Sequence, residues 1–412
     1  MFKFVGPLPA SKSILNRALI LQSYFPELQI LGSSAADDVL KLQQALQQLL
    51  HPHSEKAIKR GADQIFDLGA GGTSFRFFAL RASRQPGSYQ VGMSERLASR
   101  PWQEIQEVLK YFGVSAELKH NTFFIHSRGW NEPTGAESNH FSASRSLFVD
   151  SSRSSQFLSS VLLNAWNLNF DLHIRTQRSM PSESYYEMTK GLLQSLGLQI
   201  SEHIDDQEKE IVIVQGQKPK STLVSVEADM SSLFTLACAA LINGEIEVTN
   251  FSQTSLQADV IGLEFLQQMG GQIQMGSSLK VHRTESLKPL RADLTQSPDL
   301  FPCLAVMCAL ADGESFLTGL SQLKYKESDR LNKTMELLRY AGVRCEMQGE
   351  ALRIWGSSKL THDDFIFDPD HDHRMAFAAA LFNLKGVKIK VLTPEVVQKS
   401  WPEFWSILGV KP

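Results

Sequence analysis

The sequence predicts an α/β protein with two similar domains, each built from three repeated units of helices and strands. Three observations indicate this class. Six strongly apolar runs follow short polar segments along the 412 residues. Amphipathic helices alternate with these runs, and β-branched segments supply strands between them. Three units per domain place the domain boundary at about residue 225, although no Pro-, Gly- or Ser-rich linker marks it.

The six apolar runs are predicted to be buried helices, because a helix that is hydrophobic most of the way round leaves no face for water. Their polar first residues suit N-terminal caps. Pro302 lies in the first turn of its run, where proline is tolerated. The runs begin near Ser13, Thr73, Ser155, Ser231, Asp299 and Arg374.

Between these runs the sequence repeats a second element, an amphipathic helix that stops at a glycine and leads into a strand. Glycine suits the residue after a helix because it adopts the left-handed backbone conformation without strain. The expected strands include 211–215, 246–250 and 387–392, which are rich in Val and Ile. The predicted capping glycines are Gly113, Gly197, Gly270 and Gly342.

The composition is that of an ordinary soluble protein, with 42% hydrophobic residues, 21% charged residues and a formal net charge of −3. This balance predicts no general attraction to nucleic acid or to an acidic membrane surface. Neither a signal peptide at the start nor a membrane-spanning segment is expected. The cysteines suit reduced core thiols and hence a cytoplasmic protein; they are Cys238, Cys303, Cys308 and Cys345.

Two charged clusters are the strongest functional signal: Lys-Glu-Ser-Asp-Arg at 326–330 and Asp-His-Arg at 372–374. Each combines acids and cations where a helix is predicted to begin. If the first run is helical, Lys326 and Arg330 share one face, and like charges at that spacing favour an anion between them. Glu327 among these cations could then exchange protons. The alternative is a solvent-exposed helix face with ordinary salt bridges.

Helix starts of this kind predict anion binding, because a helix N-terminus offers unpaired amide donors and a positive dipole. Several buried helices could direct such ends into one cleft between the domains, where phosphate or carboxylate ligands would bind. Alternatively, the arginines only cap helices and cross-link the domains. The cations near these starts are Lys12, Arg17, Arg76, Arg330 and Arg374, and Arg96 and Arg100 come from a loop.

Taken in order, these motifs make the chain resemble the EPSP synthase family of enolpyruvyl transferases. Each motif alone is weak, but their order and spacing are specific, and they span nearly the whole chain. They are ASKS at 10–13, NRA at 16–18, GGTSFR at 71–76, SERLASRP at 94–101, SSQFLSS at 154–160, ADMSS at 228–232, SPD at 297–299, KESDR at 326–330, DHRMA at 372–376 and PEVVQKSWP at 394–402.

The resemblance implies two domains of three βαβαββ repeats each, an inside-out α/β barrel arrangement in which sheets surround buried helices. It assigns 12–226 to an N-terminal domain that binds shikimate 3-phosphate. Residues 1–11 and 227–412 would form a C-terminal domain with the phosphoenolpyruvate site and the acid–base residues. The active site would lie in the interdomain cleft.

The implied reaction moves the enolpyruvyl group of phosphoenolpyruvate to the 5-hydroxyl of shikimate 3-phosphate and releases phosphate. It proceeds by addition and elimination through a tetrahedral intermediate and belongs to chorismate and aromatic amino acid biosynthesis. The family implies a cytoplasmic monomer with no organic cofactor and no metal, acting on these two small molecules without nucleic acid or membrane partners.

The resemblance also assigns residues, with Asp299 as the base toward the hydroxyl and Glu327 as the proton carrier at the methylene carbon. The implied catalytic residues are Asp299, Glu327, Lys12 and His373. Those implied for phosphoenolpyruvate are Lys12, Gly72, Arg100, Gln156, Arg330, Arg374 and Lys399. Those implied for shikimate 3-phosphate are Lys12, Ser13, Arg17, Ser154, Ser155, Gln156, Ser182, Tyr185, Asp299, Gln322 and Lys326.

Other readings of the same residues remain open. The acidic and histidine-rich segment 368–373 could be read as a metal cluster, but adjacent residues in a turn point apart. Ala70 and Arg153 depart from the family pattern and would suit a non-catalytic paralogue that binds phosphorylated metabolites. The sister enzyme acting on UDP-N-acetylglucosamine normally uses a loop cysteine in the region of 92–101, and this chain has no cysteine before Cys238.

Overall fold

The computed structural model describes residues 2–51, 63–132, 146–356, 360–361 and 363–412. Its contacts divide the chain into two compact units. The N-terminal unit comprises Lys12–Gly32 and Asp38–Val226, and the C-terminal unit comprises Met1–Ser11, Ser33–Asp37 and Glu227–Pro412. Each unit contains two four-stranded sheets and one two-stranded sheet among the described residues.

The first four-stranded sheet of the N-terminal unit has the order β3-β4-β6-β5. Its first pair is parallel and the other pairs are antiparallel, so the chain runs β–α–β–α–β–β. A short helix, α5 (Glu95–Ala98), precedes the second long helix. The elements are β3 (Gln64–Asp67), α4 (Gly72–Ser83), β4 (Pro86–Gly92), α6 (Gln103–Tyr111), β5 (Ser115–Lys119) and β6 (Thr122–Arg128).

The second sheet of this unit, β7-β8-β10-β9, repeats the same chain order. The third is the parallel pair of β11 (Leu223–Ser225) and β2 (Gln29–Leu31), which belongs with α1 (Lys12–Gln22) and α2 (Asp37–Leu50). The second repeat contains β7 (Leu147–Phe148), α7 (Gln156–Ala165), β8 (Leu172–Gln177), α8 (Glu183–Ser195), β9 (Ser201–Ile204) and β10 (Glu208–Ile213).

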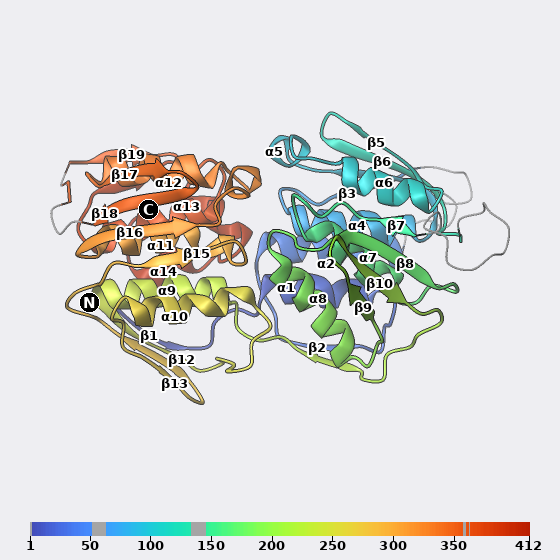
Figure 1. Cartoon of the computed structure of the whole chain (residues 1–412), viewed down its shortest axis with the longest axis horizontal. Helices are drawn as coiled ribbons and strands as arrows, with labels where there is room; N and C mark the ends of the chain where they lie inside the picture. Colours follow the sequence, from blue (N-terminus) through green and yellow to red (C-terminus); the bar gives the residue numbers. More distant parts are fainter. Residues whose placement is uncertain (1, 52–62, 133–145, 357–359, 362) are drawn as a thin grey trace. The chain divides into compact units, whose positions relative to one another are not determined.

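The C-terminal unit begins with the first strand of the chain, β1 (Phe2–Gly6), which pairs in parallel with β12 (Gly244–Val248). The resulting sheet has the order β1-β12-β14-β13, and Figure 1 shows this strand beside segments from the second half of the chain. The other elements of this repeat are α9 (Met230–Asn243), η2 (Ala258–Val260), α10 (Ile261–Gln268), β13 (Ile273–Met275) and β14 (Leu279–His282).

The second C-terminal repeat forms the sheet β15-β16-β18-β17, and the third contributes the parallel pair β19-β20. The second contains β15 (Arg291–Asp293), η3 (Pro298–Leu300), α11 (Phe301–Leu310), β16 (Gly313–Thr318), η4 (Leu323–Tyr325), α12 (Arg330–Tyr340), β17 (Arg344–Gln348) and β18 (Ala351–Gly356). The third contains β19 (Phe365–Phe367), α13 (His373–Leu384), β20 (Ile389–Val391), η5 (Pro394–Lys399) and α14 (Phe404–Leu408).

The predicted α/β class with two units of three repeats is therefore confirmed. In each unit two repeats have the complete βαβαββ order, and the third has only its parallel strand pair among the described residues. Among the described residues, the third repeat of each unit is thus shorter than the complete βαβαββ copy that the family resemblance implied. The parallel pairs β3–β4, β7–β8, β15–β16 and β19–β20 are each joined through a helix, as parallel strands require, whereas long stretches of the chain separate β1 from β12 and β2 from β11.

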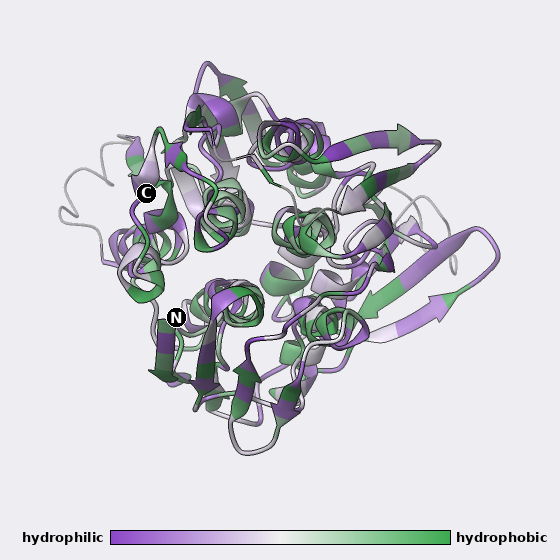
Figure 2. Ribbon diagram, turned by 90° about the vertical axis from the view of Figure 1, so that its left-hand side faces the viewer, coloured by the Kyte–Doolittle hydropathy of each residue, from purple (hydrophilic) through white to green (hydrophobic). Residues whose placement is uncertain are grey.

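The apolar runs form the centre of each unit. Helices α1, α4 and α7 pack against one another in the N-terminal unit, and α9, α11 and α13 do so in the C-terminal unit. In the view of Figure 2 the hydrophobic colour gathers on such central helices, whereas the outer strands alternate between hydrophobic and hydrophilic residues. Most residues of each of these six helices are buried, which confirms the prediction that all six runs are buried helices.

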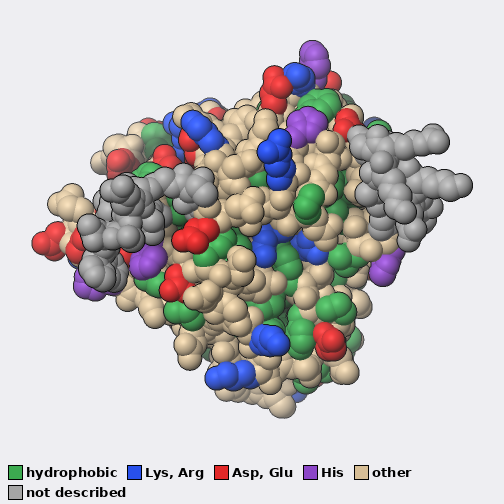
Figure 3. Space-filling view, turned by 90° about the vertical axis from the view of Figure 1, so that its right-hand side faces the viewer, with side chains coloured by type: hydrophobic (Ala, Val, Ile, Leu, Met, Phe, Trp, Pro, Cys, Tyr) green, Lys and Arg blue, Asp and Glu red, His purple; other side chains and the backbone are tan. Residues whose placement is uncertain are grey.

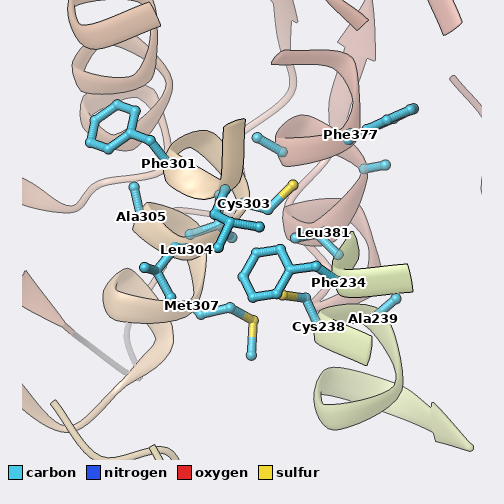
Figure 4. Packing of buried hydrophobic residues seen from close by; sticks show 14 of the residues in the cluster. Phe234, Cys238, Ala239, Phe301, Cys303, Leu304, Ala305, Met307, Phe377 and Leu381 are labelled. Carbon is cyan, nitrogen blue, oxygen red and sulfur yellow. The ribbon is translucent and has the colours of Figure 1, made fainter. Parts of the chain in front are cut away.

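Close packing in the C-terminal unit explains why these helices carry so few polar side chains. Figure 4 shows side chains of α9, α11 and α13 directed toward one another, among them Phe234, Cys303 and Leu381. All four cysteines are buried and free, which confirms the prediction of core thiols. Pro302 lies in the first turn of α11, as expected.

The four predicted capping glycines all have left-handed backbones, with φ values of 74° for Gly113, 80° for Gly197, 94° for Gly270 and 79° for Gly342. Each follows an amphipathic helix, so the prediction is confirmed at all four positions.

On the face drawn in Figure 3, acidic, basic and hydrophobic side chains are interspersed. No helix in the described part of the chain is long and apolar enough to cross a membrane.

Candidate active site

Three helices of the C-terminal unit begin close together and carry the predicted charged motifs. Asp299 lies in the 3-10 turn before α11, Arg330 is the first residue of α12, and Arg374 is the second residue of α13. These helices pack against one another. The packing of these helices therefore brings charged helix starts from the second and third repeats of this unit to one place.

Residues 326–329 lie outside α12, so Lys326 and Arg330 do not have the helical spacing that the sequence suggested. Asp329 is the N-cap of α12, and its carboxylate accepts a hydrogen bond from the Asn332 amide. An Asp at this position favours a helix that begins at the next residue, Arg330, rather than one that begins earlier in the motif. Lys326 has an extended backbone. The prediction that a helix starts at this motif is nevertheless correct.

Arg330 is the centre of the cluster, with a side chain that is only 1% exposed. Its Nη1 lies 2.6 Å from Asp299 Oδ1, its Nη2 lies 2.7 Å from Glu327 Oε2, and its Nε lies 2.7 Å from Asp372 Oδ2. Burial would lower the pKa of Arg330, but the three carboxylates outweigh burial and raise it well above its usual value. One guanidinium thus holds three acids together.

Asp299 also pairs with Arg374, whose Nη2 lies 2.7 Å from Asp299 Oδ2. Burial alone would raise the pKa of Asp299, but Arg374, Arg330 and Lys326 reverse this effect, so the pKa lies well below its usual value. Lys399 Nζ lies 3.6 Å from the other oxygen of Glu327. We call Asp299, Glu327, Arg330, Asp372 and Arg374 the carboxylate–arginine cluster.

Asp372 is a member of this cluster to which the sequence analysis assigned no role. It is the N-cap of α13, where it accepts a hydrogen bond of 3.0 Å from the Arg374 amide. It also accepts one of 3.1 Å from the Ser328 hydroxyl. Its place in the Asp-His-Arg motif, immediately before an apolar helix, was the available signal.

The structure places the other predicted residues of this unit as follows. His373 is buried, with Nδ1 3.9 Å from Asp372 Oδ1 and its ring edge-on to Phe377. Lys326 acts on Asp299 through its charge. Gln322 begins the segment that leads to Lys326, and its amide donates a 2.7 Å hydrogen bond to the Thr295 carbonyl.

In the N-terminal unit, Arg17 is buried and bonded to neutral acceptors. Its nitrogens donate to Thr189 Oγ1 at 2.7 Å, to the Ser13 carbonyl at 2.7 Å and to the Tyr185 carbonyl at 2.9 Å. None of the ion pairs found among the described residues involves Arg17. Burial lowers the pKa of Arg17 to about 10, so the cation is destabilised and an anion beside it would be favourable.

Serines at the starts of two further helices, α7 and α8, take part in neighbouring hydrogen bonds. The Ser155 hydroxyl donates a 2.6 Å hydrogen bond to the carbonyl of Ser182, which has a left-handed backbone. Ser154 accepts a 3.3 Å hydrogen bond from the Gln156 amide at the start of α7. We call Ser13, Arg17, Ser155, Ser182 and Tyr185 the arginine–serine network; it joins positions up to about 170 residues apart in the chain.

Two more arginines adjoin the start of α4. Arg76 Nη1 donates a 2.6 Å hydrogen bond to Gln156 Oε1. A Cβ at Gly72 would lie 2.9 Å from Arg100 Nη1 and 3.2 Å from Arg76 Nη1. Only glycine leaves room for both guanidinium groups in this arrangement. Gly72, Arg100 and Gln156 were predicted as site residues, whereas Arg76 was recognised as a cation near a helix start but given no role.

Lys12 begins α1, and its Nζ lies 2.9 Å from Asp38 Oδ2. Asp38 is buried, and no sequence motif singled it out. Within the described residues, no group of three or more His, Cys, Asp or Glu side chains is arranged to hold a metal ion. The side chains described above can transfer protons through carboxylates and bind anions through arginine, lysine, hydroxyl groups and helix starts.

Comparison with solved structures agrees with this description of the fold. The EPSP synthase from Acinetobacter baumannii aligns with a TM-score of 0.72 at 20% identity, covering 99% of this chain and 95% of that one. The enolpyruvyl transferase NikO from Streptomyces tendae aligns with a TM-score of 0.64 at 14% identity, covering 99% and 94%. The fold is that of an enolpyruvyl transferase.

Sequence relatives narrow this class. The family described as EPSP synthase (3-phosphoshikimate 1-carboxyvinyltransferase) matches residues 6–408. A 3-phosphoshikimate 1-carboxyvinyltransferase from Methanosphaerula palustris is 30% identical over 97% of this chain and 95% of its own length. One from Syntrophobacter fumaroxidans is 30% identical over 97% and 94%. This chain belongs to the EPSP synthase family.

Proposed function

We propose that the chain transfers the enolpyruvyl group of phosphoenolpyruvate to the 5-hydroxyl of shikimate 3-phosphate and releases phosphate. The observation that carries this proposal is the pairing of Asp299 and Glu327 with the same buried guanidinium of Arg330. The reaction needs one group that takes a proton from a hydroxyl and another that protonates a carbon. Family membership supports the same reaction.

In the addition step, the 5-hydroxyl oxygen attacks C2 of phosphoenolpyruvate and its proton passes to Asp299, while Glu327 gives a proton to C3. In the elimination step, C3 returns a proton to Glu327, the bond from C2 to the phosphate oxygen breaks, and the phosphate leaves with the proton that Asp299 took from the hydroxyl. Only protons and carbon–oxygen bonds change, so side chains suffice and we propose no cofactor. His373 would support this centre from its position beside Asp372.

The two arginine partners of Asp299 stabilise its charged form and so lower its pKa. The carboxylate is therefore ionised but weakly basic. Arg330, Arg374 and Lys399 are the residues we propose for phosphoenolpyruvate. When its phosphate and carboxylate bind these cations, they compete with Asp299 and Glu327 for the same donors. Substrate binding would thereby raise the pKa of Asp299 and make it a stronger base at the moment it is needed.

The arginine–serine network is the proposed site for shikimate 3-phosphate. Its support is the buried Arg17 cation beside hydroxyls and helix starts, an arrangement that favours phosphate. Ser154 and Gln156 would contribute from the start of α7, and Gln322 and Lys326 from the C-terminal unit. We propose that phosphoenolpyruvate contacts Lys12, Gly72, Arg100 and Gln156. Of these residues, Lys12 and Gln156 would contact both substrates.

We also propose that the protein is a cytoplasmic monomer. The four buried free thiols support the cytoplasmic location.

The direct test is steady-state phosphate release with purified enzyme. Release should require shikimate 3-phosphate and phosphoenolpyruvate together. Turnover with UDP-N-acetylglucosamine in place of shikimate 3-phosphate would assign the chain to the sister reaction instead. Binding of both metabolites without turnover would show a non-catalytic paralogue, the alternative that Ala70 and Arg153 suggested.

Replacing Arg17 with methionine should raise the KM for shikimate 3-phosphate by about 10- to 100-fold, since hydrogen bonds to a charged group contribute about 1.5–3 kcal/mol. The KM for phosphoenolpyruvate should change much less. Arg81→Met is the matched control, because Arg81, which lies in α4, is also a buried arginine but bonds to Ser23 instead. Equal effects of both substitutions on the KM for shikimate 3-phosphate would contradict the role of Arg17.

A further inference from the structure

A fourth carboxylate lies beside the carboxylate–arginine cluster and has no part in the proposed reaction. Asp259, in η2, is 4% exposed. The Ser231 hydroxyl donates a hydrogen bond to its Oδ2. Its Oδ1 is buried and has no hydrogen-bond partner within the described residues. A buried carboxylate so sparsely bonded is costly when ionised, so its protonation state depends on the charges around it.

These charges come from three elements. Asp229 lies at the N-cap of α9, Asp299 precedes α11, and Arg374 lies in the first turn of α13. Helix α9 packs against both η2 and η3, and the hydroxyl of Ser297, two residues before Asp299, donates a 2.9 Å hydrogen bond to the carbonyl of Ala258, the residue before Asp259. Burial and the charge of Asp299 raise the pKa of Asp259 to about 7, Asp229 acts in the same direction, and Arg374 and the Ser231 hydroxyl oppose them.

The guanidinium of Arg374 therefore lowers the pKa of both Asp259 and Asp299. Arg374 is bonded to Asp299 at 2.7 Å, and the pKa of Asp299 lies well below its usual value. Of the two carboxyl groups, Asp299 carries its charge throughout the neutral pH range, whereas Asp259 exchanges its proton with solvent near neutral pH. The arrangement leaves Arg374 with one strongly bonded carboxylate rather than two.

We propose that Asp259 is a positioning residue that couples phosphoenolpyruvate binding to proton uptake by keeping Arg374 available to the substrate. This rests on the proposed function, in which Arg374 binds phosphoenolpyruvate. When the anion engages Arg374, the guanidinium compensates Asp259 less, and the negative charge of the substrate acts on it as well. An ionised Asp259 then takes a proton from solvent and becomes a neutral carboxylic acid.

The sign of the pH effect follows from this coupling. At a pH below the pKa of Asp259, the group is already neutral and the substrate binds without an added charge beside it. At higher pH, Asp259 is ionised in the free enzyme, repels the anion and competes for Arg374. The affinity for phosphoenolpyruvate should therefore fall as pH rises through neutrality.

The test compares the KM for phosphoenolpyruvate between pH 6 and 8.5, at saturating shikimate 3-phosphate, in the wild type and in Asp259→Asn. Asparagine keeps the shape of the side chain but cannot ionise. We expect the ratio of the wild-type KM to the variant KM to rise at least threefold across this range. Taking the ratio removes the titration of the substrate's own phosphate. Asp312→Asn, which changes an exposed carboxylate just after α11, should leave the wild-type profile unchanged.

A second measurement does not depend on turnover. Calorimetry of phosphoenolpyruvate binding to the wild-type enzyme, in two buffers with different ionisation enthalpies, should detect more proton uptake near pH 7.5 than binding to Asp259→Asn. Parallel KM profiles together with equal proton uptake would overturn the proposal. A wild-type enzyme that releases no phosphate would instead contradict the proposed function.

If Asp259→Asn does not fold, Ser231→Ala provides the same test. Loss of the hydroxyl removes a hydrogen bond that favours the ionised carboxylate, so the rise in KM should move to higher pH. An unchanged midpoint in a folded Ser231→Ala enzyme would also count against the proposal.

Discussion

Replacing Glu327 with glutamine is expected to lower kcat by about 10²- to 10⁴-fold, the range for loss of a general acid or base. The amide oxygen can still accept the hydrogen bond from Arg330 Nη2, which is 2.7 Å in the native cluster. An amide cannot, however, carry a proton to the methylene carbon. The change therefore removes the proposed chemistry while retaining the shape of the side chain.

The measurement is steady-state phosphate release with both substrates, accompanied by a thermal melt to show that the variant folds. Glu336→Gln is the matched control, because Glu336 lies on α12, the helix that follows Glu327, and pairs with Lys333 outside the cluster. Its kcat should stay near the wild-type value. A kcat for Glu327→Gln within about threefold of wild type would remove Glu327 from the mechanism.

A labelling experiment separates the roles of the two carboxylates. In deuterated water, Glu327 would deliver deuterium to C3, and reversal of the step would leave label in the product methylene group. Glu327→Gln should suppress this incorporation relative to turnover. If label enters at the wild-type level per turnover, the proton at C3 comes from another group.

The central helices could be predicted because their signal is local. Runs such as 301–310 are apolar on every side, and a helix of that kind has to be buried wherever the chain places it. The glycines after the amphipathic helices could also be predicted from the sequence, since Gly113 and Gly342 each have a left-handed backbone. The incomplete third repeat in each unit was not readable, because strand pairing depends on partners far along the chain.

The charged motifs were recognised correctly, but their local geometry was not. In the run 326–330, a helical pattern competed with capping by Asp329, and the cap prevailed. Glu327 still meets Arg330 at 2.7 Å, although the turn between them is not helical. Tertiary contacts to Asp299 and Asp372 hold Arg330 in place, and no local pattern encodes these contacts.

Asp259 lay beyond sequence reasoning for a related reason. Its segment, Gln257 to Val260, contains no charge cluster and no apolar periodicity. Its environment is created by Ser231, Asp299 and Arg374, which come from three separate repeats. Only the packing of α9, α11 and α13 brings these positions together.

Asp372→Ala should be the most destabilising single change in the cluster. Asp372 is fully buried and holds Arg330 through its Nε at 2.7 Å. Removing one partner of a buried ion pair costs about 3–5 kcal/mol, because the remaining charge is left incompletely compensated. The same change removes the N-cap of α13, which contributes about 1 kcal/mol. Activity should fall as well, since Arg330 would no longer be fixed against Asp299 and Glu327.

Two further substitutions separate the contributions of Asp372. Asp372→Asn keeps an oxygen that can cap α13 but loses the charge, so it should retain the cap while weakening the hold on Arg330. Ser328→Ala removes only the 3.1 Å hydrogen bond to Asp372 and should cost about 1 kcal/mol. Amide hydrogen exchange in α13, combined with urea unfolding, reports stability within the C-terminal unit. Equal losses for Ser328→Ala and Asp372→Ala would show that the ion pair with Arg330 contributes little, and that the cluster is held instead by the apolar packing of its three helices.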